Sequence, residues 1–284
     1  MKTSTSKRLR WNVAIWLAAG LFMTSAAGMA AGPIMPDPKA EARHQPQVEE
    51  TANGIPLVNI TAPSSGGVSR NEYETFNVPD KGAILNNSYT LSKTELAGYV
   101  QGNNNMAERP AKIIVNEVTG AGSTSMDGFL EVAGNRADVV IANPNGITVN
   151  GGGFINTGKA FLTTGKPVYD GEDHLQRFDI TGGDILIEGK GLGGKETESL
   201  AILSRAVKIN AGIWAKDLHI TTGANSIDAK TLEASAIEGK GGHPAFALDT
   251  AAIGGMYAGR ITLVGTEKGL GVNNSGTWSA EDNL

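Results

Sequence analysis

The chain has 284 residues, with 24 lysines and arginines against 29 aspartates and glutamates, and it contains no cysteine. The lack of cysteine excludes disulfides, thiolate metal sites and cysteine nucleophiles from these residues. Without the first 30 residues, which hold four basic and no acidic side chains, 20 basic residues stand against 29 acidic ones, a net charge of −9. A surface this acidic repels phosphate groups, so nucleic acid and anionic lipid are not expected as partners.

Residues 1–30 are typical of a secretory signal peptide. Four basic residues lie within the first ten positions, and an apolar run over residues 11–22 follows directly. That run is too short to span a bilayer. Small residues at Ser25 and Ala27, or at Gly28 and Ala30, provide two cleavage sites, so the mature chain is expected to begin near residue 28 or 31.

Residues 31–52 are predicted to form a mobile, Pro-rich linker. They hold four prolines among polar and charged side chains, with almost nothing that could fill a core. The folded domain is expected to extend from residue 53 to residue 284.

From residue 53 onward, short apolar runs alternate with Gly, Asn and Asp, a pattern of strands and turns. No stretch sustains the periodicity of a helix; residues 92–95 match a capping box and predict two helical turns at most. Apolar residues on one face of successive strands between 209 and 234 would be buried by stacked coils of roughly 20 to 25 residues. These residues predict an all-β fold and favour a parallel β-helix slightly over a sandwich.

Three groups of residues were candidates for chemistry. Gly189, Gly191 and Gly194 fit G-x-G-x-x-G, but the following residues resemble a strand, so a loop or hairpin is expected in place of a cofactor site. The carboxylate pairs at 172–173 and 196/198 lie in polar sequence without neighbouring aromatic residues, which predicts solvated loops. The four histidines are scattered, and no metal site is expected.

The sequence therefore predicts no catalytic residue, no metal and no cofactor. The alternative is a β-helical enzyme that acts on polysaccharides, which would need acid and base groups in a cleft beside aromatic platforms. An adhesin active on its own is a third reading, and it would need a ligand surface that the sequence does not locate.

One tetrapeptide stands out between two apolar runs, at Asn143, Pro144, Asn145 and Gly146. Proline fixes φ at the first corner position, and Asn and Gly tolerate positive φ. Taken alone, the tetrapeptide predicts a rigid turn.

Residues 133–157, AGNRADVVIANPNGITVNGGGFINT, resemble the two-partner-secretion, or haemagglutination-activity, domain. Filamentous haemagglutinins, contact-dependent inhibition exoproteins and secreted haemolysins share this domain. Further blocks at 53–60, 82–87, 115–120 and 254–272 are similar to it in the same order, so the resemblance covers residues 53–276.

The resemblance implies a right-handed parallel β-helix with an N-terminal β cap and extra-helical hairpins. It also implies a secretion-signal and folding-nucleation domain, recognised by the periplasmic repeats of an outer-membrane β-barrel translocator. The parent would be an adhesin or a carrier of a contact-dependent inhibition toxin, secreted through the periplasm to the surface of a Gram-negative bacterium. A host or neighbouring cell surface is then a further partner. Family members are far longer, so the chain is a truncated product, a fragment or a small exported member.

Two asparagine-rich tetrads mark this family and supply the expected turn and translocator-recognition residues. The second tetrad is intact at residues 143–146. The first, usually Asn-Pro-Asn-Leu, falls on Asn103, Asn104, Asn105 and Met106, and the loss of proline predicts a looser turn. Val149 and Gly152 stand where relatives often carry a cysteine pair.

Overall fold

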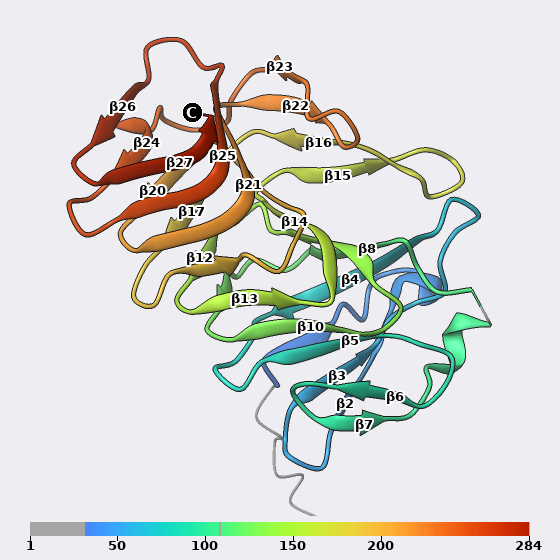
Figure 1. Cartoon of the computed structure of the whole chain (residues 1–284). Coiled ribbons are helices and arrows are strands. Elements are labelled where there is room, and N and C mark those ends of the chain that lie inside the picture. Colours follow the sequence, from blue (N-terminus) through green and yellow to red (C-terminus); the bar gives the residue numbers. More distant parts are fainter. Residues whose placement is uncertain (1–31, 108, 284) are drawn as a thin grey trace, which may run out of the picture. The chain divides into compact units, whose positions relative to one another are not determined.

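Short strands wound into successive coils make up the chain in the computed structural model, which describes residues 32–107 and 109–283 (Figure 1). The predicted signal peptide lies outside these residues. Helical structure in the described part is confined to two 3₁₀ turns, η1 (Ala42–His44) and η2 (Asn104–Met106). None of the helices described there is long and apolar enough to cross a membrane.

Each coil contributes strands to three parallel faces. Face 1 contains β3 (Pro56–Asn59), β5 (Ala83–Asn87), β10 (Phe129–Gly134), β13 (Gly152–Ile155), β18 (Leu192–Gly194) and β27 (Thr277–Asn283). Face 2 contains β4 (Val68–Phe76), β8 (Ile113–Val118), β11 (Ala137–Ala142), β14 (Thr157–Thr163) and β19 (Ser199–Ser204). Face 3 contains β9 (Thr124–Met126), β12 (Ile147–Val149), β17 (Asp184–Ile187), β20 (Ala206–Ile209), β24 (Phe246–Thr250) and β26 (Gly271–Asn274). The long strands β21 (Gly212–Thr222) and β25 (Gly255–Gly265) pass from face 1 into face 2.

Side chains alternate along each strand, and the parallel register stacks equivalent side chains above one another. In β11, Val139 and Ile141 point into the interior, whereas Val140 and Ala142 point outward. The pairing places one continuous interior column on face 2, made by Ile114, Val139, Ala160, Leu200, Leu218 and Ile261. This shared core confirms the predicted parallel β-helix.

The predicted linker is wrong for the residues that are described, because they form the N-terminal cap. β1 (Ile34–Pro36) pairs antiparallel with β4, and β2 (Gln47–Glu50) pairs antiparallel with β3. Ile34 is buried in the core. The side chains of Glu49 and Glu50 are exposed, and only their backbone takes part in the sheet. Composition misses β2 because Val48 is the only apolar side chain that this strand packs against the core.

A hairpin of β6 (Ser92–Thr94) and β7 (Gly98–Val100) replaces the short helix expected at residues 92–95. The Thr94 hydroxyl donates to the carbonyl of Gly98 at 2.8 Å and closes the hairpin. The backbone N–H groups of Glu95 and Leu96 donate to the carboxylate of Glu131 at 2.7 and 2.9 Å. The carboxylate of the distant Glu131 satisfies these two N–H donors, so they need no partner within a helix.

A second antiparallel sheet covers the outer surface of face 2. Its strands are β15 (Lys166–Tyr169), β16 (Leu175–Ile180), β22 (Asn225–Asp228) and β23 (Ala234–Ala236). Phe178 and Ile227 of this sheet join one buried cluster with Val140 and Leu203 of face 2. Face 2 is therefore apolar on both sides, and the expectation of extra-helical hairpins is confirmed.

The glycines of the G-x-G-x-x-G pattern form a turn and a strand. Gly189 and Gly191 have positive φ in the turn, and Gly194 ends β18. The next regular element is strand β19, so no helix N-terminus faces this loop. A loop was expected here, and Gly189 and Gly191 do lie in one, whereas Gly194 belongs to a strand.

Candidate functional site

The tetrad of residues 143–146 forms the corner between β11 of face 2 and β12 of face 3. The Asn145 N–H donates to Asn143 Oδ1 at 2.9 Å, and the Gly146 N–H donates to the Asn143 carbonyl at 3.1 Å. This is an Asx turn combined with a β-turn. Gly146 has φ +110, which a β-branched residue rarely adopts.

The same asparagines tie the corner to the coils on either side. Asn143 is fully buried, and its Nδ2 donates to Gly122 O at 2.9 Å and Thr124 Oγ1 at 3.0 Å in the preceding coil. Its backbone N–H donates to Thr163 O at 2.9 Å in the following coil. Asn145 Nδ2 donates to Gly120 O at 2.8 Å. The tetrad therefore holds three levels of the stack together.

The first tetrad has the same turn. The Asn105 N–H donates to Asn103 Oδ1 at 3.0 Å, and the Met106 N–H donates to the Asn103 carbonyl at 3.1 Å. Asn103 Nδ2 donates to the carbonyls of Ile60 and Asn86 at 2.8 and 2.9 Å. The structure thus keeps the hydrogen bonds of the second tetrad where a looser turn was expected. Asn103 and Asn105, on either side of Asn104, take part in these hydrogen bonds. A proline at position 104 has no N–H group and would not be needed for them.

Val149 and Gly152 meet at the next corner. A Cβ added to Gly152 would lie 2.8 Å from Val149 Cγ1, and Val149 is fully buried. The valine side chain therefore occupies the space beside residue 152, where the family resemblance places a disulfide in other members.

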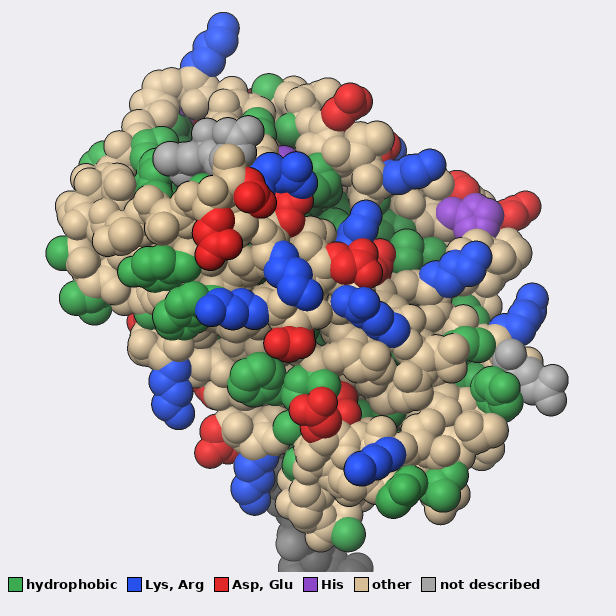
Figure 2. Space-filling view, in the orientation of Figure 1, with side chains coloured by type: hydrophobic (Ala, Val, Ile, Leu, Met, Phe, Trp, Pro, Cys, Tyr) green, Lys and Arg blue, Asp and Glu red, His purple; other side chains and the backbone are tan. Residues whose placement is uncertain are grey.

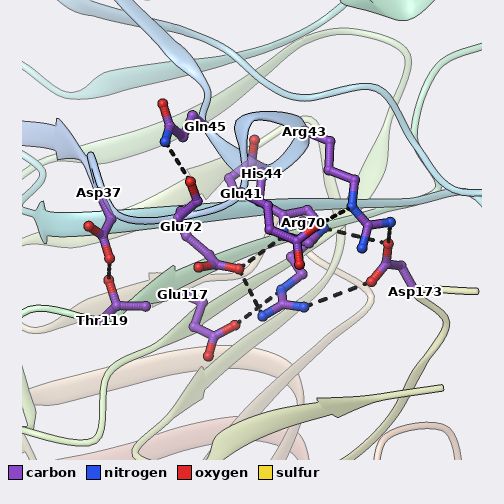
Figure 3. Close-up of polar contacts among 12 residues, drawn as sticks. Asp37, Glu41, Arg43, His44, Gln45, Arg70, Glu72, Glu117, Thr119 and Asp173 are labelled. Carbon is purple, nitrogen blue, oxygen red and sulfur yellow. Dashed lines mark hydrogen bonds and ion pairs between the residues drawn. The ribbon is translucent and has the colours of Figure 1, made fainter. Parts of the chain in front are cut away.

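A network of charged side chains joins the cap to the β-helix (Figure 3). Arg70 on β4 lies at its centre, with Nη2 2.8 Å from Glu72 Oε1 and Nε 3.5 Å from Glu117 Oε2 on β8. Its guanidinium lies 4.3 Å from the ring centroid of Tyr169. Glu72 also contacts His44 Nδ1 of η1 at 3.1 Å.

Asp173, in the loop between β15 and β16, joins this network from the other side. Arg43 Nη1 lies 2.6 Å from Asp173 Oδ2, and His44 Nε2 lies 3.5 Å from the same oxygen. The side chain of Asp173 is only 18% exposed, whereas that of Glu172 is 72% exposed. The expectation of a solvated pair is therefore wrong for Asp173, which ties the hairpin loop to η1.

Burial raises the pKa of the Glu117 carboxyl to about 6, although the nearby Arg70 guanidinium opposes this shift. The opposite case is Glu267, which accepts hydrogen bonds from Arg205 Nη2 at 2.7 Å and Arg205 Nε at 3.0 Å. The hydrogen bonds from Arg205 lower the pKa of Glu267 to about 2. The two groups thus act on stability in different ranges of pH.

The second carboxylate pair is exposed, as expected of a loop. Glu198 Oε1 lies 3.3 Å from Arg136 Nη1, and both side chains are largely exposed. Aromatic residues do lie nearby, contrary to expectation: Phe129 and Trp214 line a cavity of about 290 Å³ together with Glu196. Local sequence could not show this, because only the register of the coils brings these residues together. In the part of the chain that the structure describes, no group of three or more His, Cys, Asp or Glu side chains could hold a metal ion.

Residues 33–284 match the family described as the TPS secretion domain, and the chain belongs to this family. The chain is 47% identical over 245 residues to "Toxin CdiA" of Yersinia pestis and 48% identical over 229 residues to "16S rRNA endonuclease CdiA" of Enterobacter cloacae. These alignments cover 86% and 80% of this chain but only 7% of each relative. The suspected resemblance is confirmed.

The fold is similar to that of the filamentous hemagglutinin secretion domain, with a TM-score of 0.80 and 33% sequence identity. The likeness covers 88% of this chain and 84% of that structure. Together these similarities define a secretion domain of a secreted or cell-surface exoprotein of Gram-negative bacteria.

Proposed function

We propose that this chain is the export-recognition domain of a longer exoprotein, bound in the periplasm by the repeats of a dedicated outer-membrane β-barrel translocator. The observation that carries the proposal is the match to the TPS secretion domain over residues 33–284. The relatives of which this chain spans 7% bear toxin and nuclease names. A carrier of a contact-dependent inhibition toxin is therefore the parent that we favour, acting at a neighbouring cell surface, with an adhesin as the alternative.

We place translocator binding on the β6–β7 hairpin and the first tetrad. The hairpin is a two-stranded sheet, so each strand keeps one edge without a partner strand in the described part of the chain. Tyr99 on β7 is 70% exposed, and Leu91 beside β6 is 57% exposed. Open edges with apolar side chains accept an added strand from a partner. The hairpin is joined to the tetrad through the Asn103 N–H, which donates to Ser88 O at 2.6 Å.

The second tetrad is assigned to folding after passage through the translocator. Its hydrogen bonds to Gly120, Gly122 and Thr163 can form only when neighbouring coils are in place. Each completed coil buries apolar side chains in the shared core, which makes stacking favourable step by step. Folding outside the cell would then draw the following residues outward.

Secretion assays with and without the translocator test the proposal. The full chain is expected in the medium only when a cognate outer-membrane barrel protein with periplasmic repeats is co-expressed. A double variant, Leu91→Lys with Tyr99→Lys, should reduce secretion at least tenfold and leave the melting temperature of the purified chain unchanged. Phe246→Lys, an exposed aromatic position on β24, is the matched control and should be secreted normally.

Secretion without the barrel protein would contradict the assigned function. Normal secretion of the double variant would contradict only the assigned docking surface.

A further inference from the structure

A column of aromatic residues and glycines runs across the outer surface of face 1. The strand register places five residues side by side on β10, β13, β18, β21 and β25: Phe129, Gly153, Gly193, Trp214 and Tyr257. Phe129 is 44% exposed and Tyr257 is 38% exposed. Figure 2 shows hydrophobic side chains among charged ones on the side of the molecule where β10 and β13 lie in Figure 1. Unlike face 2, this part of the helix carries exposed aromatic rings.

Gly193 makes the floor of a groove between aromatic walls. A Cβ on Gly153 would lie 2.4 Å from Phe129 Cε1, so the Phe129 ring lies over that glycine. A Cβ on Gly193 would meet no atom closer than 3.8 Å, so this position is open. Phe129 and Trp214 stand three strands apart, which is about 14 Å between their backbones. The cavity between them has a volume of about 290 Å³.

The Trp214 wall is held in place by its neighbour. Its ring stacks on that of Tyr257, with centroids 6.1 Å apart and an angle of 14° between the planes. A Cβ on Gly212 would lie 2.4 Å from the same ring, so the indole also lies against this backbone. Preformed aromatic walls bind a ligand at a small entropic cost.

The rim of the groove is polar and balanced in charge. The groove continues into a second cavity of about 660 Å³, and both cavities are lined by Phe129 and Glu196. Six exposed charged side chains line the two cavities: Glu95, Glu196, Glu198, Arg136, Lys195 and Lys216. Three carboxylates against three cations give no net charge, so the rim offers hydrogen-bond donors and acceptors without selecting an ion.

We propose that this aromatic groove binds the pyranose rings of a neutral oligosaccharide. One face of a pyranose carries C–H groups, which aromatic faces attract, while its hydroxyls suit a rim of mixed donors and acceptors. Glycine inside a strand marks a place where a ligand or another backbone approaches closely. The groove therefore gives the secretion domain a second, glycan-binding activity that is separate from its export.

Saturation-transfer NMR on the purified chain tests the proposal with three probes: cellohexaose, chitohexaose and maltohexaose. At least one should show saturation transfer, with calorimetry giving its affinity. Gly193→Leu fills the open floor without a backbone clash and should weaken binding at least tenfold. Trp214→Ala should do the same, and Phe246→Ala, at an exposed aromatic position on β24, should bind like the original chain.

Gly193→Leu keeps both aromatic walls, so the test does not depend on the stability of the Trp214→Ala variant. The proposal is overturned if none of the three neutral probes gives a signal at millimolar concentration, or if binding survives in Gly193→Leu. A preference for a heparin hexasaccharide would overturn the neutral class. Binding of a polyproline decamer in place of the sugars would make the groove a peptide site and equally overturn it. Export is measured separately, so failure here leaves the secretion assignment untouched.

Discussion

Restoring proline at position 104 should stabilise the domain. Asn104 is the first residue of η2, the helical position at which proline is most readily accommodated. Asn103 before it has φ −83 and ψ 117, extended values close to those that a following proline favours. Within residues 32–107 and 109–283, no acceptor takes the Asn104 N–H, and the side chain is exposed. The substitution therefore removes no hydrogen bond described by the structure.

The size of the effect follows from the unfolded chain. A proline whose native φ already suits the ring restricts the unfolded state and adds about 0.4 to 1 kcal/mol. For a domain of this size, 1 kcal/mol corresponds to roughly 2 to 4 °C in melting temperature. We therefore expect Asn104→Pro to raise the midpoint by about 1 to 4 °C.

Thermal unfolding of the purified domain, followed by circular dichroism, measures this shift. Asn104→Ala is the matched control, because it removes the same side chain without fixing φ, and its midpoint should stay close to that of the original chain. A midpoint for Asn104→Pro below that of Asn104→Ala would refute the reasoning. It would show that the first tetrad has a turn geometry different from that of the second.

Three further predictions concern the second tetrad and the two shifted carboxyls. Asn143→Ala should cost about 1 to 3 kcal/mol in urea unfolding, because it removes the donor to the Gly122 carbonyl and to the buried Thr124 hydroxyl. Gly146→Val should cost a similar amount through its φ of +110; unchanged stability and export in both would contradict the assigned corner. The pKa of the Glu117 carboxyl, about 6, lies above its usual 4.5. The contribution of this carboxyl to the free energy of unfolding is therefore complete below pH 4.5 and is lost as the pH rises through 6. Glu117→Gln should remove this change, which amounts to about 2 kcal/mol. The lowered pKa of Glu267 acts in the opposite sense: its contribution is present above pH 4.5 and is lost as pH falls toward 2, and Glu267→Gln should abolish that loss in acid unfolding.

The interior of the fold could be predicted from sequence, because the residues that fill it repeat in short apolar runs. Val139 and Ile141 lie in such a run, and both belong to the buried core of the structure. The resemblance implied an N-terminal cap, but composition did not place it at residues 34–50, because Glu49 and Glu50 enter the sheet only through their backbone. The hairpin at residues 92–100 escaped because its free N–H groups are satisfied by the distant Glu131.

The candidate sites likewise divide into those that could be predicted from the sequence and those that could not. The corner at residues 143–146 was visible because its chemistry is local, and the first tetrad was recognised by resemblance. Its hydrogen bonds could not be predicted from the loss of proline alone. The network around Arg70 and the aromatic groove bring together residues from separate coils, and only the register of the strands determines which ones meet.

The contact between Val149 and Gly152 has a consequence for the timing of folding. Corners of this chain close through hydrogen bonds and packing, both of which are reversible, and its 284 residues contain no cysteine that could form a covalent crosslink. An oxidising compartment therefore cannot trap a premature loop of these residues through a disulfide. Oxidants and reductants should likewise leave the rate of refolding unchanged, since no step waits for thiol chemistry.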